Sequence, residues 1–315
     1  MASTAYADTP ERTQRVPSGV SVTDILLLCM ALVWGVNFIV VKFATGIFAP
    51  LAFNSVRIAL AVVVLWTIVL VRGQPLPDKQ QILRMLGLGM LGNGLYQILW
   101  VEGMALTRAS DAALLVAASP AFIEIIGWAR GHDRIGLRGM AGIAMSLAGI
   151  GLVVSGGVNG AAGHSTLAGN AFIMASVLCW AFYSIGLKPL TERVDGITLS
   201  AVTMTGGIVP MVIVGAPSLL ATKWTAIGPA GWAAVAYSGL LALVVAYLFW
   251  YRGVRVLGPT RASMYSNLQP LFAMTGAWLL LGETPRVMQI AGAVCIIGGL
   301  LLTRLPGRQA IVASE

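Results

Sequence analysis

Ten runs of about 20 mostly apolar residues follow one another along this chain, and each is long enough to cross a bilayer as a helix. Hydrophobic residues make up 57% of the 315 positions, charged residues only 10%, and the mean hydropathy is +0.85. A water-exposed globular surface cannot accommodate this composition. The sequence predicts an all-α integral membrane protein with ten transmembrane helices, over residues 24–46, 50–71, 82–103, 108–129, 136–156, 168–188, 197–218, 229–251, 259–281 and 287–303.

The short loops between these runs exclude several classes of protein. They leave no room for a soluble catalytic domain, and no GxxxxGK[ST] sequence indicates ATP coupling. The clustered His, Asp and Glu typical of a membrane-embedded enzyme are missing, so we expect no enzyme and no cofactor. Cys29, Cys179 and Cys295 fall inside apolar runs, and His132 and His164 lie in different loops. Neither a disulfide framework nor a metal site is expected.

The positive charges are distributed unevenly between alternate loops. If the N-terminus is cytoplasmic, fifteen basic residues fall on the inside, at Arg12, Arg15, Arg72, Lys79, Arg84, Arg130, Arg134, Arg138, Lys188, Arg193, Arg252, Arg255, Arg261, Arg304 and Arg308. Only Arg108, Lys223 and Arg286 fall outside. This asymmetry is typical of membrane topology, so the net charge of +8 does not indicate nucleic-acid binding. Both termini are expected in the cytoplasm, and the membrane is expected to be the bacterial inner membrane.

The chain also carries an internal duplication. The frame Trp-x7-Lys occurs as WGVNFIVVK at 34–42 and again, 146 residues later, as WAFYSIGLK at 180–188. A shift of 150 aligns Trp100 with Trp250, Gly103 with Gly253, Ala112 with Ala262 and Pro120 with Pro270. Because each unit holds five spans, an odd number, the second unit must enter the membrane upside down. Inverted repeats of this kind are typical of transporters.

These boundaries divide the chain into five parts. We expect a polar cytoplasmic N-terminus at 1–23, a first five-helix repeat at 24–156, a Gly-rich linker at 157–167, a second repeat at 168–303 and a cytoplasmic tail at 304–315.

Four stretches resemble the EamA-type branch of the drug/metabolite transporter superfamily: WGVNFIVVK at 34–42, DAALLVAASP at 111–120, TRASMYSNLQPLFAMTGAWLLLGE at 260–283 and AGAVCIIGGLLL at 291–302. The resemblance implies ten helices in two inverted repeats, with helices one to four of each half around a central cavity and the fifth and tenth as buttresses. The first half departs from the pattern, because Gly131-His132 replaces the Gly-Glu present at Gly282-Glu283. By analogy the sequence is most similar to exporters of amino acids, including aromatic ones, although nucleotide-sugar and triose-phosphate carriers share the architecture.

Polar and aromatic side chains at membrane depth are expensive unless they face protein or water, so their helical spacing indicates a transport route. Asn93, Tyr96, Gln97 and Trp100 form an i, i+3, i+4, i+7 stripe, and Ser263, Ser266, Asn267 and Pro270 form another. The predicted substrate-binding residues are Trp34, Asn37, Asn93, Tyr96, Gln97, Trp100, Tyr183, Tyr247, Tyr265, Asn267 and Gln269. Two alternatives stay open: interfacial aromatic belts, and amides that only join helices.

Ionisable residues inside the spans are few. Lys42, Arg57 and Glu102 approach the outer level, and Lys188 and Glu124 the inner level, so the sequence predicts charge pairs that gate the two ends. The alternative is that both lysines snorkel to the nearest headgroups. No carboxylate lies in the middle third of a span, which favours facilitated diffusion or exchange over proton antiport.

The leading hypothesis is a secondary transporter that exports small metabolites, most of all amino acids, by alternating access. The alternatives are an exporter of nucleobases or cationic drugs, a membrane-embedded enzyme, or a membrane subunit that does not transport. The expected partners are a small-molecule substrate and the lipid bilayer. The sequence does not indicate an oligomeric state.

Overall fold

The computed structural model describes residues 21–73, 75–129, 136–158 and 165–304. Within these ranges every regular element is helical, and seven helices are long and apolar enough to cross a membrane. They span Val22–Thr45, Pro50–Arg72, Ala109–Ala129, Leu137–Gly156, Leu167–Thr191, Gly196–Ala221 and Pro229–Leu257. A shorter apolar helix occupies Val287–Leu302. The all-helical membrane class is confirmed, whereas the predicted count of ten is not.

Two of the remaining predicted spans are helical along their length, but each contains a short segment of a different helix type. The first consists of α3 (Lys79–Gly89), the π-helical segment η1 (Met90–Leu95) and α4 (Tyr96–Leu106). The second consists of α12 (Pro259–Tyr265), the 3-10 segment η4 (Ser266–Leu268) and α13 (Gln269–Leu281). A π-helical segment also interrupts Pro229–Leu257, which is nevertheless one of the seven spans, so a change of helix type does not by itself divide a membrane helix.

The other elements are uninterrupted helices or paired pieces. They are α1 (Val22–Thr45), α2 (Pro50–Arg72), α5 (Ala109–Val116), α6 (Ser119–Ala129), α7 (Leu137–Val158), α8 (Leu167–Thr191), α9 (Gly196–Ala221), η2 (Trp224–Ala226), α10 (Pro229–Ala236), the π-helical η3 (Tyr237–Val245), α11 (Ala246–Leu257) and α14 (Val287–Arg304). Ser21 begins α1 with a capping box that includes Asp24, and Asp195 accepts hydrogen bonds from the first amides of α9.

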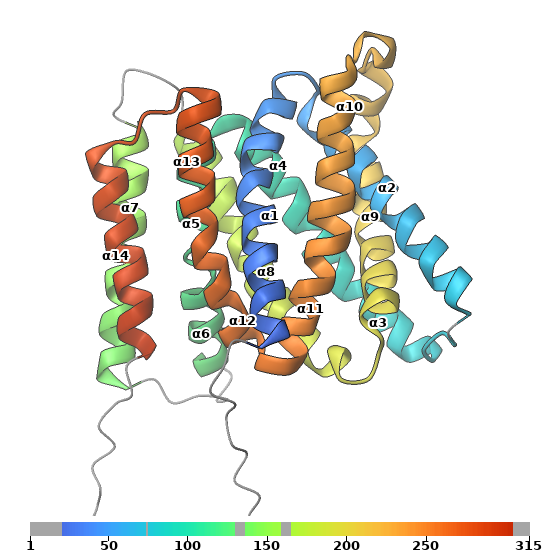
Figure 1. Ribbon diagram of the computed structural model, residues 1–315, viewed down its shortest axis with the longest axis horizontal. Coiled ribbons are helices and arrows are strands. Elements are labelled where there is room, and N and C mark those ends of the chain that lie inside the picture. Colours follow the sequence, from blue (N-terminus) through green and yellow to red (C-terminus); the bar gives the residue numbers. More distant parts are fainter. Residues whose placement is uncertain (1–20, 74, 130–135, 159–164, 305–315) are drawn as a thin grey trace, which may run out of the picture.

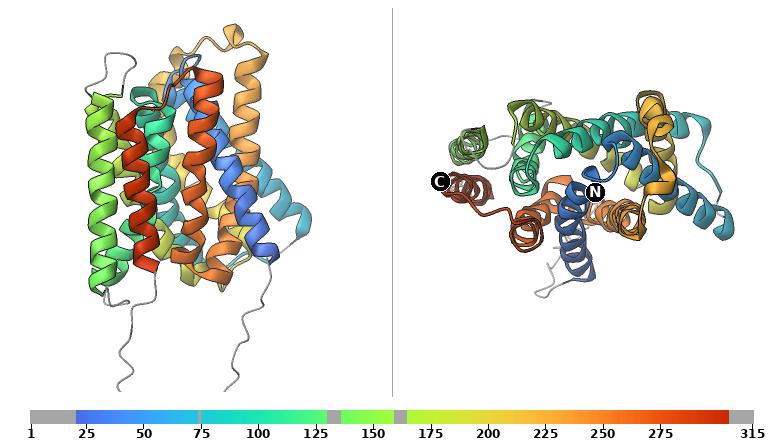
Figure 2. Two further views of the ribbon diagram at one scale, coloured as in Figure 1. Left: turned by 60° about the vertical axis from the view of Figure 1, so that its left-hand side comes forward. Right: turned by 90° about the horizontal axis from the view of Figure 1, so that it is seen from above.

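Figure 1 shows the helices as one bundle, with the beginning of α1 and the end of α14 at the same lower side. Helices α7 and α14 lie side by side at one edge, clearest from above in Figure 2. Their backbones approach closely: a Cβ on Gly149 would lie 2.7 Å from the carbonyl oxygen of Gly292. Small residues permit this contact, which is the usual basis of helix packing in membranes. The remaining helices form the larger body that holds the cavity.

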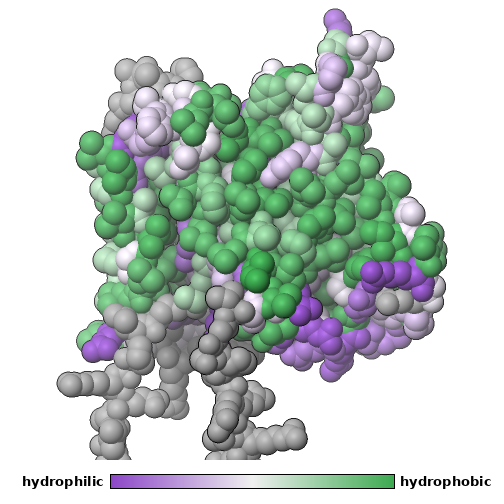
Figure 3. Space-filling view, in the orientation of Figure 1, coloured by the Kyte–Doolittle hydropathy of each residue, from purple (hydrophilic) through white to green (hydrophobic). Residues whose placement is uncertain are grey.

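The surface of the bundle is apolar over most of its height, and polar residues gather at the lower edge near α2 and α3 (Figure 3). Large hydrophobic side chains such as Leu70, Leu220 and Leu280 are each more than 70% exposed. Such exposure would be unfavourable in water and is expected where lipid chains cover the protein.

The two shifts seen in the sequence also relate equivalent contacts in space. The π-helical segments end at Leu95 and Val245, a separation of 150, while α2 and α9 begin at Pro50 and Gly196, a separation of 146. A Cβ on Gly89 would lie 1.9 Å from the carbonyl oxygen of Thr203. At the related place, a Cβ on Gly239 would lie 3.0 Å from the carbonyl oxygen of Arg57. Helix crossings at corresponding positions therefore use corresponding glycines.

Candidate central cavity

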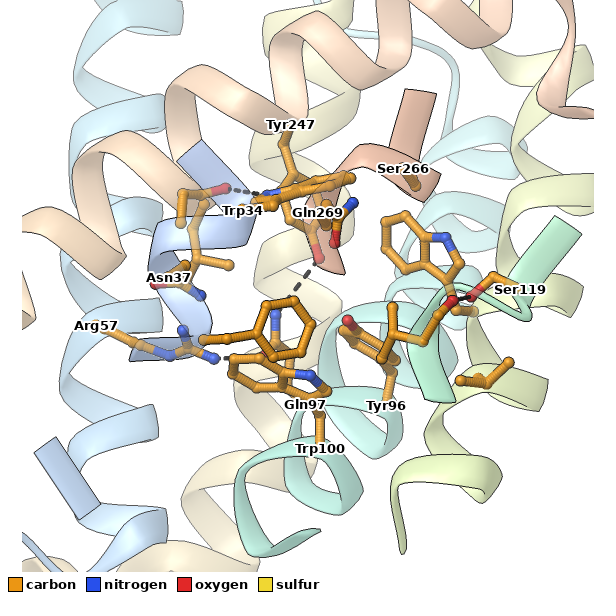
Figure 4. Close-up of a pocket in the computed structure, with 16 residues that line it drawn as sticks. Trp34, Asn37, Arg57, Tyr96, Gln97, Trp100, Ser119, Tyr247, Ser266 and Gln269 are labelled. Atoms are coloured by element: carbon orange, nitrogen blue, oxygen red, sulfur yellow. Dashed lines mark hydrogen bonds between the residues drawn. The ribbon is translucent and has the colours of Figure 1, made fainter. Parts of the chain in front are cut away.

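A cavity lies inside the larger body of the bundle, with about 590 Å³ of space between atoms, part of it open to solvent, and side chains from both halves of the chain line it (Figure 4). Its lining residues are Trp34, Asn37, Phe38, Arg57, Tyr96, Gln97, Trp100, Val116, Ser119, Val177, Trp180, Ala242, Leu243, Tyr247, Ser266 and Gln269. The mixture of aromatic surface with a few polar groups is typical of a small-molecule site.

Arg57 supplies the charge of this lining and is only 1% exposed. Its Nε donates to Asn54 Oδ1, its Nη1 to Ser238 Oγ and its Nη2 to Gln97 Oε1, each at 2.6 Å. The guanidinium carbon also lies 5.1 Å from the ring centroid of Trp100. We call Asn54, Arg57, Gln97 and Ser238 the arginine layer. It joins the first half to the second through Ser238.

The acceptors of the arginine layer are themselves held in place. The Asn54 amide nitrogen donates to the main-chain oxygen of Gln97 at 2.9 Å, which turns its Oδ1 toward Arg57. Ser238 donates onward to Asn37 Oδ1 at 2.7 Å. The Gln97 amide donates to the Tyr247 hydroxyl at 3.4 Å. Fixed acceptors hold a guanidinium in one orientation, which is what a preorganised binding group needs.

Aromatic rings form the opposite part of the lining. Trp34 meets Trp180 at 5.7 Å and Tyr247 at 5.6 Å, both nearly edge to face, and Tyr96 lies 5.2 Å from Trp180. Trp34 is also fixed by a hydrogen bond of 2.9 Å from its Nε1 to the oxygen of Ala242. These rings give the cavity a rigid apolar wall with hydroxyl and amide groups at its edges.

Breaks in two helices bring small polar side chains to the cavity. Pro120 cannot donate to the carbonyl of Val116, and the Ser119 hydroxyl donates to that oxygen instead, at 2.5 Å. In the second half the matched Pro270 follows the 3-10 segment η4, which places Ser266 and Gln269 in the lining. Proline thus explains why both helices change course beside the cavity.

Comparison with known proteins assigns the chain to a family. The EamA-like transporter family matches residues 21–155 and again residues 167–305, which together make up most of the sequence. The chain belongs to the EamA-like transporter family. Its helices are therefore membrane helices of a transporter, and the cavity between its halves is the place to look for a transported solute.

Several relatives of this EamA-like transporter match it over most of its length. An uncharacterised transporter, YyaM, of Bacillus subtilis is 26% identical over 88% of this chain and 92% of its own length. An uncharacterised transporter of Archaeoglobus fulgidus is 27% identical over 90% of this chain and 97% of its own length. A probable amino-acid metabolite efflux pump of Salmonella typhimurium is 25% identical over 88% and 93%. One solved crystal structure matches with a TM-score of 0.65 at 18% identity, over 91% of this chain and 99% of the other, which shows a common fold.

The cavity of this EamA-like transporter gathers seven of the predicted binding residues. They are Trp34, Asn37, Tyr96, Gln97, Trp100, Tyr247 and Gln269. Asn93, Tyr183, Tyr265 and Asn267 lie outside it. Of these, Tyr265 donates from its hydroxyl to Asp24, and Asn267 borders a separate apolar hollow beside α14.

Asn93 and Tyr183 belong instead to a second buried polar cluster. The hydroxyls of Tyr183 and Tyr251 are hydrogen-bonded at 2.7 Å, and Thr203 Oγ1 lies 3.3 Å from the hydroxyl of Tyr251. The Asn93 amide reaches the Tyr183 hydroxyl at 3.5 Å. We call Asn93, Tyr183, Thr203 and Tyr251 the tyrosine layer.

The predicted gating residues are dispersed. Lys42 donates to the main-chain oxygens of Met104, Ala105 and Thr107 at 3.0, 3.2 and 2.7 Å, at the end of α4. Lys188 donates to the oxygen of Arg255 at 3.1 Å and pairs with Glu192 at 3.0 Å. Both lysines therefore bind the carboxyl-terminal end of a helix of their own half, where a cation is favoured. Arg57 turns into the cavity, while Glu102 on α4 and Glu124 on α6 are half-buried.

The predicted binding set omits several residues that line or support the cavity, Trp180 among them. Asn54 and Ser238 orient Arg57, and Ser119 lines the cavity. Asn54 lies three residues before Arg57 on one helix face, a spacing that could have identified it. Ser238 is 181 residues from Arg57, and no local pattern connects the two.

Glu283 lies at the upper end of the bundle, where it binds backbone amides. Its carboxylate accepts hydrogen bonds from the backbone amides of Ala109 and Ser110 at 3.0 and 3.1 Å, and it lies 3.6 Å from Arg108 Nε. A carboxylate at a helix amino terminus is stabilising. Glu283 thereby caps α5 from the other half. The predicted counterpart in the first half, Gly131-His132, lies outside the described residues.

Proposed function

We propose that this protein exports small metabolites, with amino acids first and aromatic ones among them, from the cytoplasm by alternating access through the central cavity. The observation that carries the proposal is a cavity lined from both halves, in which aromatic rings surround a few polar groups and the single cation Arg57. One relative is named a probable amino-acid metabolite efflux pump, which supports the same class. Nucleobases and cationic drugs are the competing cargo.

The proposed architecture is ten spans in two inverted five-helix repeats, with domain limits at 24–156 and 168–303. The family matches the chain twice, and the interrupted segments Lys79–Leu106 and Pro259–Leu281 are each helical along their length. The basic residues described at the lower side, such as Arg72 and Lys79, support a cytoplasmic lower face, with both termini there. The bacterial inner membrane is the proposed location.

Transport is proposed to run down a solute gradient or by exchange. The lining described above contains no Asp or Glu that could carry a proton through the cavity. The described cross-half contacts, such as Arg57 with Ser238 and Trp34 with Ala242, would break and re-form as the halves rock about the cavity.

Purified protein in liposomes tests this proposal. Vesicles loaded with unlabelled solute are exposed to radiolabelled amino acids, nucleobases, sugars and organic cations, with and without a pH gradient. Saturable amino-acid uptake that exceeds uptake into protein-free vesicles and does not require a pH gradient is expected. Saturable uptake of organic cations with none of amino acids would refute the proposed cargo, and strict dependence on a pH gradient would refute the proposed coupling.

A further inference from the structure

Arg57 is a buried cation that lacks a carboxylate partner in the part of the chain the structure describes. Its hydrogen-bond acceptors are an asparagine, a serine and a glutamine, all neutral. A buried charge is costly unless it is paired, and a one-sided arrangement of this kind is uncommon away from functional sites. The cavity therefore holds an uncompensated positive charge.

The donors of this site are not all used. A guanidinium carries five N–H groups, and the described residues accept from three nitrogen atoms of Arg57 through one bond each. Two N–H groups remain for a ligand. The indole N–H of Trp100, a cavity-lining residue that is 4% exposed, also has no acceptor among the described residues. The unused donors of Arg57 suit an anionic acceptor on a bound solute.

We propose that Arg57 binds the carboxylate of the transported solute inside the cavity. This inference rests on the proposed export function and names the group through which the cargo is recognised. The two free N–H groups of Arg57 would donate to the carboxylate oxygens, beside the Trp100 ring, whose centroid lies 5.1 Å from the guanidinium carbon. Charge-assisted hydrogen bonds from arginine to a carboxylate are stronger than those between neutral groups.

The charge of the cavity distinguishes a carboxylate from other cargo. Arg57 is the single cationic residue among the lining residues, so one carboxylate would pair with it, whereas a phosphate dianion would bring a second negative charge that has no partner in the lining. An organic cation would meet a like charge without an acidic side chain in the lining to offset it. A neutral nucleobase would leave the charge of Arg57 uncompensated.

The orientation of Arg57 also suits this role. The ring centroids of Phe53 and Trp100 lie 5.6 and 5.1 Å from the guanidinium carbon, and the other members of the arginine layer accept hydrogen bonds from the guanidinium nitrogens. A guanidinium held in this way loses little freedom when an anion binds, which favours affinity. Lysine could not reproduce the same planar set of donors.

A ligand series on the wild-type protein is the first test, because it requires no variant to fold. Thermal stabilisation and liposome uptake are measured for phenylalanine, its amide, phenethylamine, 3-phenylpropionate and a phosphonate analogue, and the series is repeated on any amino acid with higher uptake. The two carboxylates are expected to bind at least about tenfold more tightly than the amide or the amine. Equal or tighter binding of the amine or amide would overturn the role of Arg57 and leave transport itself standing. A preference for the phosphonate would overturn the carboxylate assignment, and failure of every compound in both assays would overturn amino-acid export together with it.

Substitution of Arg57 is the second test. Arg57→Gln should lower carboxylate affinity at least about tenfold and leave amide affinity within about twofold, while Arg57→Lys should recover part of the loss. Arg72→Gln, at the exposed end of α2, serves as the matched control and should change neither. If a folded Arg57→Gln protein retains its preference for the acid over the amide, the proposal is wrong.

Discussion

The arginine layer and the tyrosine layer each join the two halves, and the duplication relates them through one pair of residues. Arg57 corresponds to Thr203 at the shift of 146. The main-chain oxygen of Arg57 lies against Gly239, and that of Thr203 lies against the matched Gly89. In the arginine layer a cation has spare donors and lines the cavity. In the tyrosine layer neutral hydroxyls satisfy one another at 2.7 and 3.3 Å, away from the cavity.

This difference shows which structural features the two repeats share and which they do not. Helix ends, π-helical segments and close glycine contacts recur in both halves because they set how backbones cross. Side chains that meet at the crossings are free to diverge once the backbone is supported. One backbone arrangement thus holds a cation with spare donors on one side and a neutral polar cluster on the other, in which Asn93 Oδ1 has no partner among the described residues.

The matched glycines should give the largest effect. Gly89→Ala places a methyl group 1.9 Å from the Thr203 oxygen, whereas Gly239→Ala places one 3.0 Å from the Arg57 oxygen. Overpacking of the tighter contact is expected to cost more than about 3 kcal/mol, and the looser one about 1 kcal/mol. Thermal unfolding in detergent measures both. Equal losses would show that the two crossings are equally tight.

Next in size is the removal of a support for Arg57. Asn54→Ala leaves the guanidinium without one acceptor, and a loss of about 1.5–3 kcal/mol is expected because the partner is charged and buried. Ser200→Ala, at the related place in the second half, removes a buried hydroxyl that has no partner among the described residues and should change stability by less than about 0.5 kcal/mol. Stability and amino-acid affinity are measured for both, and a larger effect at Ser200 would contradict the comparison.

The two lysines provide a smaller contrast. Lys42→Met removes three hydrogen bonds to carbonyl oxygens at the end of α4 and should cost about 1–2 kcal/mol. Lys188→Met removes one such bond and a half-exposed ion pair, and less than about 1 kcal/mol is expected. The unfolding midpoint in low and high salt checks both values. A strong salt effect on the Lys42 contribution would be inconsistent with its buried carbonyl contacts.

A modest effect is expected in the tyrosine layer. Tyr251→Phe removes the hydroxyl that meets Tyr183 and Thr203 and should lower stability by about 0.5–1.5 kcal/mol. Carboxylate affinity should not change, because neither tyrosine lines the cavity. Calorimetric titration with the transported amino acid measures affinity. A tenfold fall would show that the tyrosine layer takes part in binding.

Much of the fold follows from sequence patterns, and the departures have local causes. Predicted span 24–46 corresponds to α1 at Val22–Thr45, and 50–71 to α2 at Pro50–Arg72. The stripe of Asn93, Tyr96, Gln97 and Trp100 assumes 3.6 residues per turn throughout, but Asn93 lies within the π-helical η1. The wider turn changes the phase of the helix there, so Asn93 faces Tyr183 while the other three line the cavity.

The same reasoning explains the second stripe and the charge of the site. A 3-10 turn at Ser266–Leu268 tightens the helix, and Ser266 and Gln269 reach the cavity while Tyr265 and Asn267 do not. Depth along α2 placed Arg57 near the outer end, but depth alone does not reveal which way a side chain points. Its partners Gln97 and Ser238 lie on other helices, so their meeting depends on tertiary packing.

The lysines of the repeated Trp-x7-Lys frame donate to main-chain oxygens, and this explains how the same lysine can recur in both repeats although its neighbours differ. Every residue type supplies the same carbonyl, so the partner positions could drift to Ala105 in one copy and Arg255 in the other without loss of the bond. Replacement of the lysine, by contrast, would remove the donor. The two repeats therefore share the lysine that donates, while the residues that supply the acceptor oxygens differ.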